Sequence, residues 1–103
     1  MLVQSLFAGM FLFNAFPHLF MGITGKTHMT PFKRVSSPII NIIWAFANII
    51  LVVVILGFDP TTGMLRVPAG TNFWVFLFGG FFMSMADAWL FGKPGARFPW
   101  HKD

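Results

Sequence analysis

Three apolar stretches, each long enough to cross a bilayer, constrain this chain more than any other feature. They run over residues 2–23, 38–57 and 72–91. A helix needs about 20 apolar residues to span a hydrocarbon core of about 30 Å. Helices are the expected form because lipid offers no hydrogen-bond partner to an exposed backbone. The sequence therefore predicts an all-α integral membrane protein with three transmembrane helices. These form a single domain over residues 1–103, in an inner or plasma membrane.

The composition excludes several other classes of protein. The chain is 56% hydrophobic and 10% charged, with 15 phenylalanines and 3 acidic residues, whereas an average soluble domain is about 25% charged. A soluble fold of this size buries only about 60–70% of its chain surface and could not hide so many apolar groups. The chain has no cysteine, so disulfides and thiolate metal sites are excluded. No basic stripe lies on a polar scaffold, so nucleic acid is not an expected partner.

The distribution of basic residues predicts the orientation. Six of the seven Lys and Arg residues lie in the loop 24–37 and the tail 92–103, and the outer loop 58–71 holds only Arg66. With three helices, that basic loop and the tail share one side, and the positive-inside rule makes this side cytoplasmic and places the N-terminus outside. The side chains expected at lipid headgroups, or at a docking site for a partner, are Lys26, Lys33, Arg34, Lys93, Arg97, Trp100 and Lys102.

Local signals mark the expected helix ends. Ser37 and Pro38 are typical of an N-cap followed by the first helical position. Thr71 or Asn72 is expected to cap the third helix in the same way, and Gly57 suits the end of the second.

The segment GITGKT, residues 22–27, resembles the end of a phosphate-binding loop. Such a loop needs an earlier glycine where this chain has Phe20, and it needs a strand before it and a helix after it. Here an apolar helix is expected before it, and Pro31 prevents a helix from following at once. We interpret the segment as the end of the first helix and expect no nucleotide.

Polar residues inside the apolar stretches are costly in lipid and therefore informative. Their helical spacing predicts that they meet in the cytoplasmic half of the membrane, where His18 and Asp87 would form an ion pair. Two interpretations stay open: hydrogen bonds that hold the helices together, or a site that handles protons, ions or a small ligand. The expected cluster comprises Asn14, His18, Asn41, Asn48, Ser84 and Asp87.

Small residues at four-residue spacing indicate close helix packing, but they do not show which helix is the partner. They form one stripe on the third helix and a shorter one on the first. The residues are Ser5, Gly9, Gly79, Gly80, Ser84 and Ala88.

No catalytic group is expected, because one intramembrane aspartate assembles neither a triad nor a carboxylate pair. No cofactor is expected either, with haem or copper at His18 as a minor alternative. The leading hypothesis is a structural or accessory subunit that assembles with itself or with a larger membrane complex. The alternative is an oligomeric transporter, channel or ligand-binding protein that uses the polar cluster.

Overall fold

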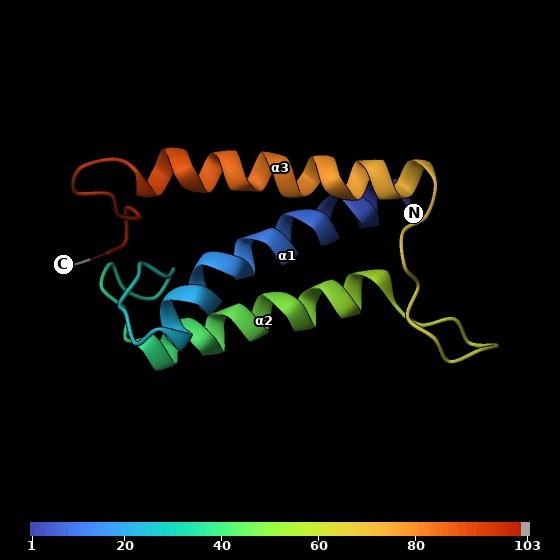
Figure 1. Cartoon of the computed structure of the whole chain (residues 1–103), viewed down its shortest axis with the longest axis horizontal. Helices are drawn as coiled ribbons and strands as arrows, with labels where there is room; N and C mark the ends of the chain where they lie inside the picture. Colours follow the sequence, from blue (N-terminus) through green and yellow to red (C-terminus); the bar gives the residue numbers. More distant parts are fainter. Residues whose placement is uncertain (102–103) are drawn as a thin grey trace.

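The chain folds into three long helices in an elongated bundle of 48 × 24 × 24 Å. The structure is a computed structural model and describes residues 1–101 (Figure 1). The helices are α1 (Leu2–Ile23), α2 (Pro38–Leu56) and α3 (Thr71–Phe91). Each is long and apolar enough to cross a membrane. The prediction of an all-helical chain with three helices able to span a membrane is confirmed.

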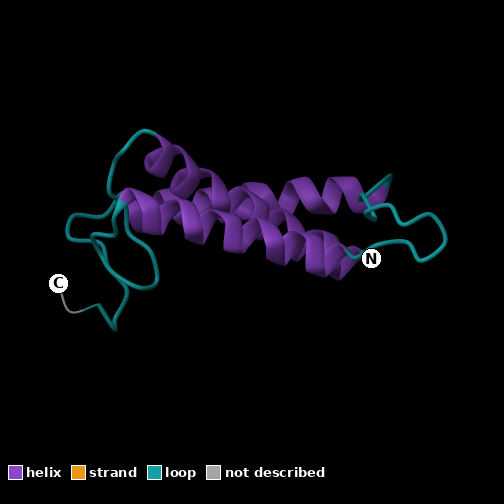
Figure 2. Cartoon of the chain, turned by 90° about the horizontal axis from the view of Figure 1, so that it is seen from below, coloured by secondary structure: helices purple, strands orange, loops and turns teal. Residues whose placement is uncertain are grey.

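Helix α1 occupies the middle of the bundle. It packs against α2 on one side and against α3 on the other, whereas no Cα atom of α2 lies within 8 Å of a Cα atom of α3. Figures 1 and 2 show the three helices side by side, with α1 crossing between its neighbours. The interior of this protein therefore consists of two separate helix interfaces that share α1.

The helix starts follow the sequence signals only in part. The Oγ of Ser37 accepts a hydrogen bond from the Ile40 amide at 3.2 Å, and Pro38 is the first residue of α2, as predicted. The expectation for α3 is wrong. Its N-cap is Gly70, which has a φ of 59° and no side chain to donate or accept, and Thr71 already lies within the helix.

Glycines bring α1 and α3 into backbone contact. A Cβ added to Gly9 would collide with the Phe76 carbonyl, and one added to Gly79 would collide with the Leu6 carbonyl. A Cβ on Gly80 would overlap the ring of Phe13. The glycines of the small-residue stripes therefore lie inside the chain's own interface, where they are not available to another protein.

The two ends of the bundle differ in composition. Loop 24–37 and the tail from Gly92 lie together at one end, while the N-terminus and loop 57–70 lie at the other (Figure 1). We call the first the basic end. Loop 24–37 is closed by a bridge between His28 and Ser36, and the opposite loop by one between Phe58 and Leu65. Lys102, expected at the headgroups, lies outside the described residues.

Candidate functional site

The interior of the basic half is polar. Of the largest fully buried side chains of the described chain, His18, Asn41, Thr30 and Ser36 lie in this half, whereas Ser5 lies near the start of α1 at the other end. Large apolar side chains are exposed on the outside of all three helices, in keeping with helices that are able to span a membrane. The structure thus concentrates hydrogen-bonding groups where a membrane-embedded site would be built.

His18 of α1 is held by Asn41 of α2. The His18 Nδ1 lies 2.9 Å from Asn41 Oδ1, and Asn41 Nδ2 donates to three loop carbonyls, those of His28, Ser36 and Ser37. Because Asn41 Nδ2 is engaged with these acceptors, Asn41 Oδ1 must accept from His18 Nδ1–H. This fixes the tautomer of the neutral ring and leaves its Nε2 as an acceptor.

Asn14 lies one helical turn deeper and touches both neighbouring helices. Its Nδ2 donates to Asn48 Oδ1 at 3.2 Å, and Asn48 Nδ2 donates to the Trp44 carbonyl at 2.9 Å. The other end of the Asn14 amide faces the carboxyl of Asp87 on α3, at 2.9 and 3.2 Å from its two oxygens. Asn14 is therefore the polar link between α2 and α3.

The expected ion pair between His18 and Asp87 does not form within the described residues. His18 turns toward α2 and Asn41, whereas Asp87 faces Asn14. The two side chains nevertheless line one small cavity of about 50 Å³, which we call the inner cavity. It is lined by Asn14, His18, Met29, Pro31, Trp44, Asp87, Leu90, Phe91 and Phe98.

Asp87 also opens onto a larger space. An open groove of about 550 Å³ runs between α1 and α3, and we call it the aromatic groove. It is lined by Phe13, Phe16, Pro17, Phe20, Ser84, Asp87, Ala88, Phe91 and Gly92. The Oγ of Ser84 donates to the Gly80 carbonyl at 2.7 Å. The half-buried carboxyl of Asp87 is consequently the one ionisable group in the wall of the groove.

The structure thus distributes the predicted polar cluster over connected contacts. His18 meets Asn41, Asn14 meets Asn48 and Asp87, and Ser84 joins Asp87 in the groove. Of the small residues, Ser5 is fully buried in α1 and its hydroxyl has no partner among the described atoms. Ala88 remains exposed in the groove wall.

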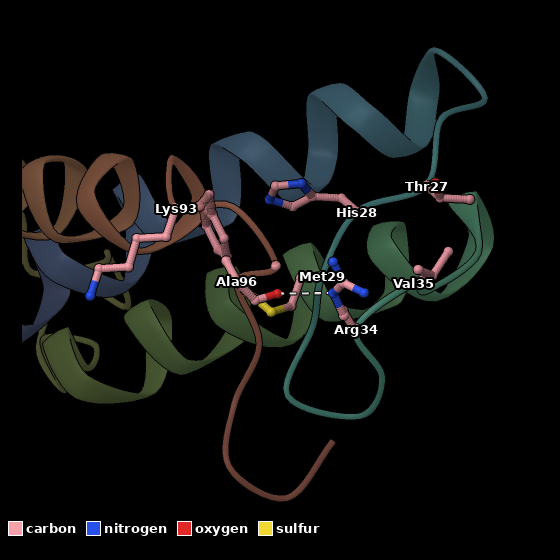
Figure 3. A pocket seen from close by; sticks show the side chains of 9 residues that line it. Thr27, His28, Met29, Arg34, Val35, Lys93 and Ala96 are labelled. Atoms are coloured by element: carbon pink, nitrogen blue, oxygen red, sulfur yellow. Dashed lines mark hydrogen bonds between the residues drawn. The ribbon is translucent and has the colours of Figure 1, made fainter. Parts of the chain in front are cut away.

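A second pocket lies at the basic end. It encloses about 320 Å³ between loop 24–37 and the start of the tail. Arg34 enters it and its Nε donates to the Ala96 carbonyl at 3.2 Å (Figure 3). The Lys93 side chain extends away from Arg34 in Figure 3, and its Nζ lies 3.3 Å from the centroid of the Trp89 ring. Arg34 and Lys93 therefore do not converge in this pocket, and the Arg34 side chain there is already hydrogen-bonded.

His28 connects this pocket to the interior. Its ring lies 5.2 Å from that of His18 and 4.5 Å from that of Phe91, between centroids. Its Nε2 is buried and has no hydrogen-bond partner among the described residues. Burial, and secondarily a charge on His18, lower the pKa of His28 below its ordinary value. The neutral imidazole is therefore the favoured form.

The remaining basic-end residues follow no single pattern. Lys26, Lys33 and Arg97 are exposed, in keeping with a position among headgroups or at a partner. Trp100 stacks on Phe98 with 4.9 Å between ring centroids and donates from Nε1 to the Pro31 carbonyl. The tail is thus fastened to loop 24–37.

The segment 22–27 ends α1. The amide of Gly25 donates to the Gly22 carbonyl at 3.0 Å and that of Lys26 to the Met21 carbonyl at 2.8 Å. These two amides cap the end of α1 by donating to its own carbonyls, so they are not free to bind a phosphate. Over residues 1–101, no group of three or more His, Asp or Glu side chains converges as a metal site would require.

The sequence interpretation missed the aromatic groove and the role of His28. Phe13, Phe16, Pro17 and Phe20 occupy positions i, i+3, i+4 and i+7, which is the spacing of one helix face. That spacing could have indicated that these side chains line one wall of a groove. His28 gave no signal, because its burial depends on how loop 24–37 folds back over α1.

Searches for similar proteins find no match to this chain among protein-family models, curated proteins or solved structures. The geometry of the site is therefore the basis for assigning a function.

Proposed function

We propose that this small multi-pass membrane protein binds an apolar organic cation in the aromatic groove. The observation that carries the proposal is the half-buried carboxyl of Asp87 on α3, set in a wall of phenylalanine rings. A cation dissolved in lipid gains from both features, since a carboxylate neutralises its charge and ring faces attract it.

The dimensions of the groove suit such a ligand. Sites for small molecules are mostly apolar, measure about 300–1,000 Å³ and carry a few placed polar groups. The groove, at about 550 Å³, has Asp87 and Ser84 as its polar side chains. Within the described residues Asp87 forms no ion pair, and the nearby Lys93 is directed to Trp89. The charge of the carboxyl is therefore available to a ligand.

The test uses the full chain in mild detergent and tetraphenylphosphonium as the probe. We expect saturable binding by isothermal titration calorimetry and a loss of at least about tenfold in affinity for Asp87→Asn. Asp59→Asn is the matched control, because it removes the same charge from an exposed turn at the opposite end. Equal affinities for the wild type and Asp87→Asn would refute the proposal.

A second candidate, an accessory subunit, is favoured by the outer face of α3. Among its residues only Gly79 and Gly80 are buried, and its Cα atoms all lie more than 8 Å from those of α2. The exposed apolar side chains of this helix are Phe73, Trp74, Phe78, Phe81, Phe82, Met85 and Trp89. Native mass spectrometry in mild detergent tests it: a discrete oligomer or a co-purified protein supports a subunit role, and a monomer opposes it.

We further infer that the basic end faces the cytoplasm, because loop 24–37 and the tail hold most of the basic residues. The chain has no cysteine, so a single introduced cysteine is the only thiol that a maleimide can label. In intact cells, an impermeant maleimide should modify Thr61→Cys and leave Lys33→Cys unmodified. The reverse pattern would invert the orientation.

A further inference from the structure

The pocket at the basic end, which we call the basic-end pocket, contains a cation that keeps most of its donors. It encloses about 320 Å³ and is lined by Arg34 and His28. The bond from Arg34 Nε to the Ala96 carbonyl uses one of the five N–H groups of a guanidinium. Among residues 1–101, the two terminal nitrogens of Arg34 donate to no protein acceptor. The Nε bond therefore orients the guanidinium and leaves its outer donors for a ligand.

His28 is a second donor without a partner. Its ring nitrogens form no hydrogen bond within the described chain, and Nε2 is nevertheless buried. In native proteins such an atom requires a partner, which can be a water, an ion or a ligand. In Figure 3 the Arg34 guanidinium and the His28 ring face the same space, whereas Lys93 points away from it. The two side chains thus form the polar part of one pocket.

Few other charged groups lie near this pair. Helix α1 contributes His18, whose ring centroid lies 5.2 Å from that of His28, and α2 has no titratable residue. On the side of α3, Lys93 is directed to Trp89. Asp87 lines the inner cavity and not this pocket. No carboxyl of the described residues therefore neutralises Arg34 within the pocket.

The ends of the helices do not by themselves attract an anion here. Helices α1 and α3 end at the basic end, and α2 begins there (Figure 1). Each helix end is equivalent to roughly half an elementary charge, negative at a C-terminus and positive at an N-terminus. Two C-termini and one N-terminus leave a small negative sum. The full charge of Arg34 outweighs this sum, so an anion depends on Arg34.

The position of the pocket indicates where an anion would come from. Phe91, the last residue of α3, lies in its wall. Where the three helices span a membrane, a space at the end of a helix lies at the level of the lipid headgroups. The exposed side chains of Lys26, Lys33 and Arg97 surround the same end and attract anionic lipids. The volume is at the lower end of the range for small-molecule sites, which suits a headgroup.

We propose that the basic-end pocket is a binding site for a phosphodiester anion, held between Arg34 and His28. The planar fork of the guanidinium donates to the two unesterified oxygens of the phosphate, and the imidazole donates to one of them. A phospholipid headgroup is the expected source, and a soluble phosphate diester offers the same group. The site lies apart from Asp87 and is independent of the proposed function.

The bound anion should change the protonation of His28. Burial, and secondarily a charge on His18, lower the pKa of His28 in the ligand-free protein. A phosphate anion beside the ring favours the imidazolium and raises that pKa again. Binding therefore takes up protons, and the affinity for the anion should increase as the pH falls.

The first test measures binding of a short-chain phosphatidylglycerol to the full chain in a non-ionic detergent, by isothermal titration calorimetry. We expect saturable binding and a loss of at least about tenfold in affinity for Arg34→Gln. Arg34→Lys keeps the charge without the fork and should lose less. Lys33→Gln is the matched control, because it removes an exposed charge from the same loop outside the pocket.

The control decides between a site and general attraction to a basic surface. Equal losses for Arg34→Gln and Lys33→Gln, or no loss for Arg34→Gln, overturn the proposal. Circular dichroism and gel filtration establish that each variant is folded before it is compared.

The second test separates the two sources of the anion. Glycerophosphoglycerol carries the same headgroup without acyl chains. Binding of the lipid at least about tenfold more tightly identifies a phospholipid as the ligand, since acyl chains add apolar contacts. Equal binding of both compounds, lost in Arg34→Gln, identifies a soluble diester at the same site. If neither compound binds, there is no phosphodiester site.

The third test uses the charge of the ligand, which is constant between pH 5.5 and 7.5 for a diester. The affinity for phosphatidylglycerol should be at least about threefold higher at about pH 5.5 than at about pH 7.5. In His28→Gln it should be the same at both. A wild-type affinity that does not depend on pH would remove His28 from the site and contradict the proposal.

Discussion

The two interfaces of α1 differ in their polar contacts, although both include a close glycine contact, which on the α2 side sets Gly22 against the Pro38 carbonyl. Toward α2, polar side chains close the contact: His18 bonds Asn41 and Asn14 bonds Asn48. Toward α3, Gly9 and Gly79 let the backbones touch. The hydrogen bonds between α1 and α2 extend to the basic end. The glycine contact between α1 and α3 ends before the basic end, and the aromatic groove lies between these two helices beyond it.

One side of α1 is therefore joined by side-chain hydrogen bonds, whereas the other side carries an open groove. Hydrogen bonds between membrane helices are directional and fix the rotation of α1. The glycine contact between α1 and α3 lies at Gly9 and Gly79, and closer to the basic end phenylalanines line the groove between the two helices. The carboxyl of Asp87 is placed where the second kind of contact ends.

The largest effect is expected from filling the glycine contact. Gly79→Ala places a Cβ against the Leu6 carbonyl, which is backbone and has little freedom to move. We expect a loss of about 3 kcal/mol of stability, at the upper end of typical overpacking, measured by thermal unfolding in detergent. Ala86→Leu, on the exposed side of the same helix, should change stability little. Equal effects of the two would show that α1 and α3 do not meet at Gly79.

The next largest effect should come from the polar interface. Asn41→Leu leaves His18 Nδ1–H without its acceptor and removes the side-chain donor to three loop carbonyls, each of which keeps one backbone N–H. We expect about 2 kcal/mol of destabilisation and faster proteolysis within loop 24–37. Gln4→Leu, an exposed amide on α1, is the control. A stable Asn41→Leu variant would indicate that packing alone holds α2.

A smaller change in stability is expected from the hydrogen bond between Asn14 and Asn48. In a double-mutant cycle, Asn14→Leu and Asn48→Leu should show a coupling of about 0.6 kcal/mol, the average for hydrogen bonds between membrane helices. The same cycle for Asn14→Leu with Gln4→Leu should show none. Additive effects in the first cycle would contradict the contact between Asn14 and Asn48.

The smallest effect should appear on acidification. Because native His28 binds its proton less tightly than an ordinary histidine of pKa 6.5, the unfolded chain takes up more protons as the pH falls through about 6.5. Stability is therefore complete above that pH and decreases below it. Thermal unfolding at about pH 7.5 and about pH 5.5 measures the change, which His28→Gln should reduce. A wild-type midpoint that rises on acidification would reverse the sign of this argument.

The sequence predicted the helices better than their contacts. Apolar length and the Ser37–Pro38 cap placed the spans to within a residue of the observed bounds, because burial in lipid depends on composition and length. Helical spacing showed that Asn14 and His18 share a face, but not how α1 is rotated toward its neighbours. That rotation depends on packing, so the pairing of His18 with Asn41 rather than Asp87 could not be foreseen.

The groove illustrates a further limit. Phenylalanine has no hydrogen-bonding group, so the sequence does not distinguish a ring in lipid from one that lines a ligand site. Phe13, Phe16 and Phe20 acquire their role only because Gly79 and Gly80 bring α3 alongside. A predicted packing motif and an unpredicted groove are here parts of one arrangement.

The fastening of the tail has a consequence for biosynthesis. Phe98 forms part of the wall of the inner cavity, and His101 and Trp100 bond to the Thr30 and Pro31 carbonyls. These residues leave the ribosome after all three helices. While the chain is being made, α1 and α2 can pair with the cavity still uncovered, and water reaches the polar interior until the tail docks. Assembly in the membrane would therefore finish with a step at the aqueous surface.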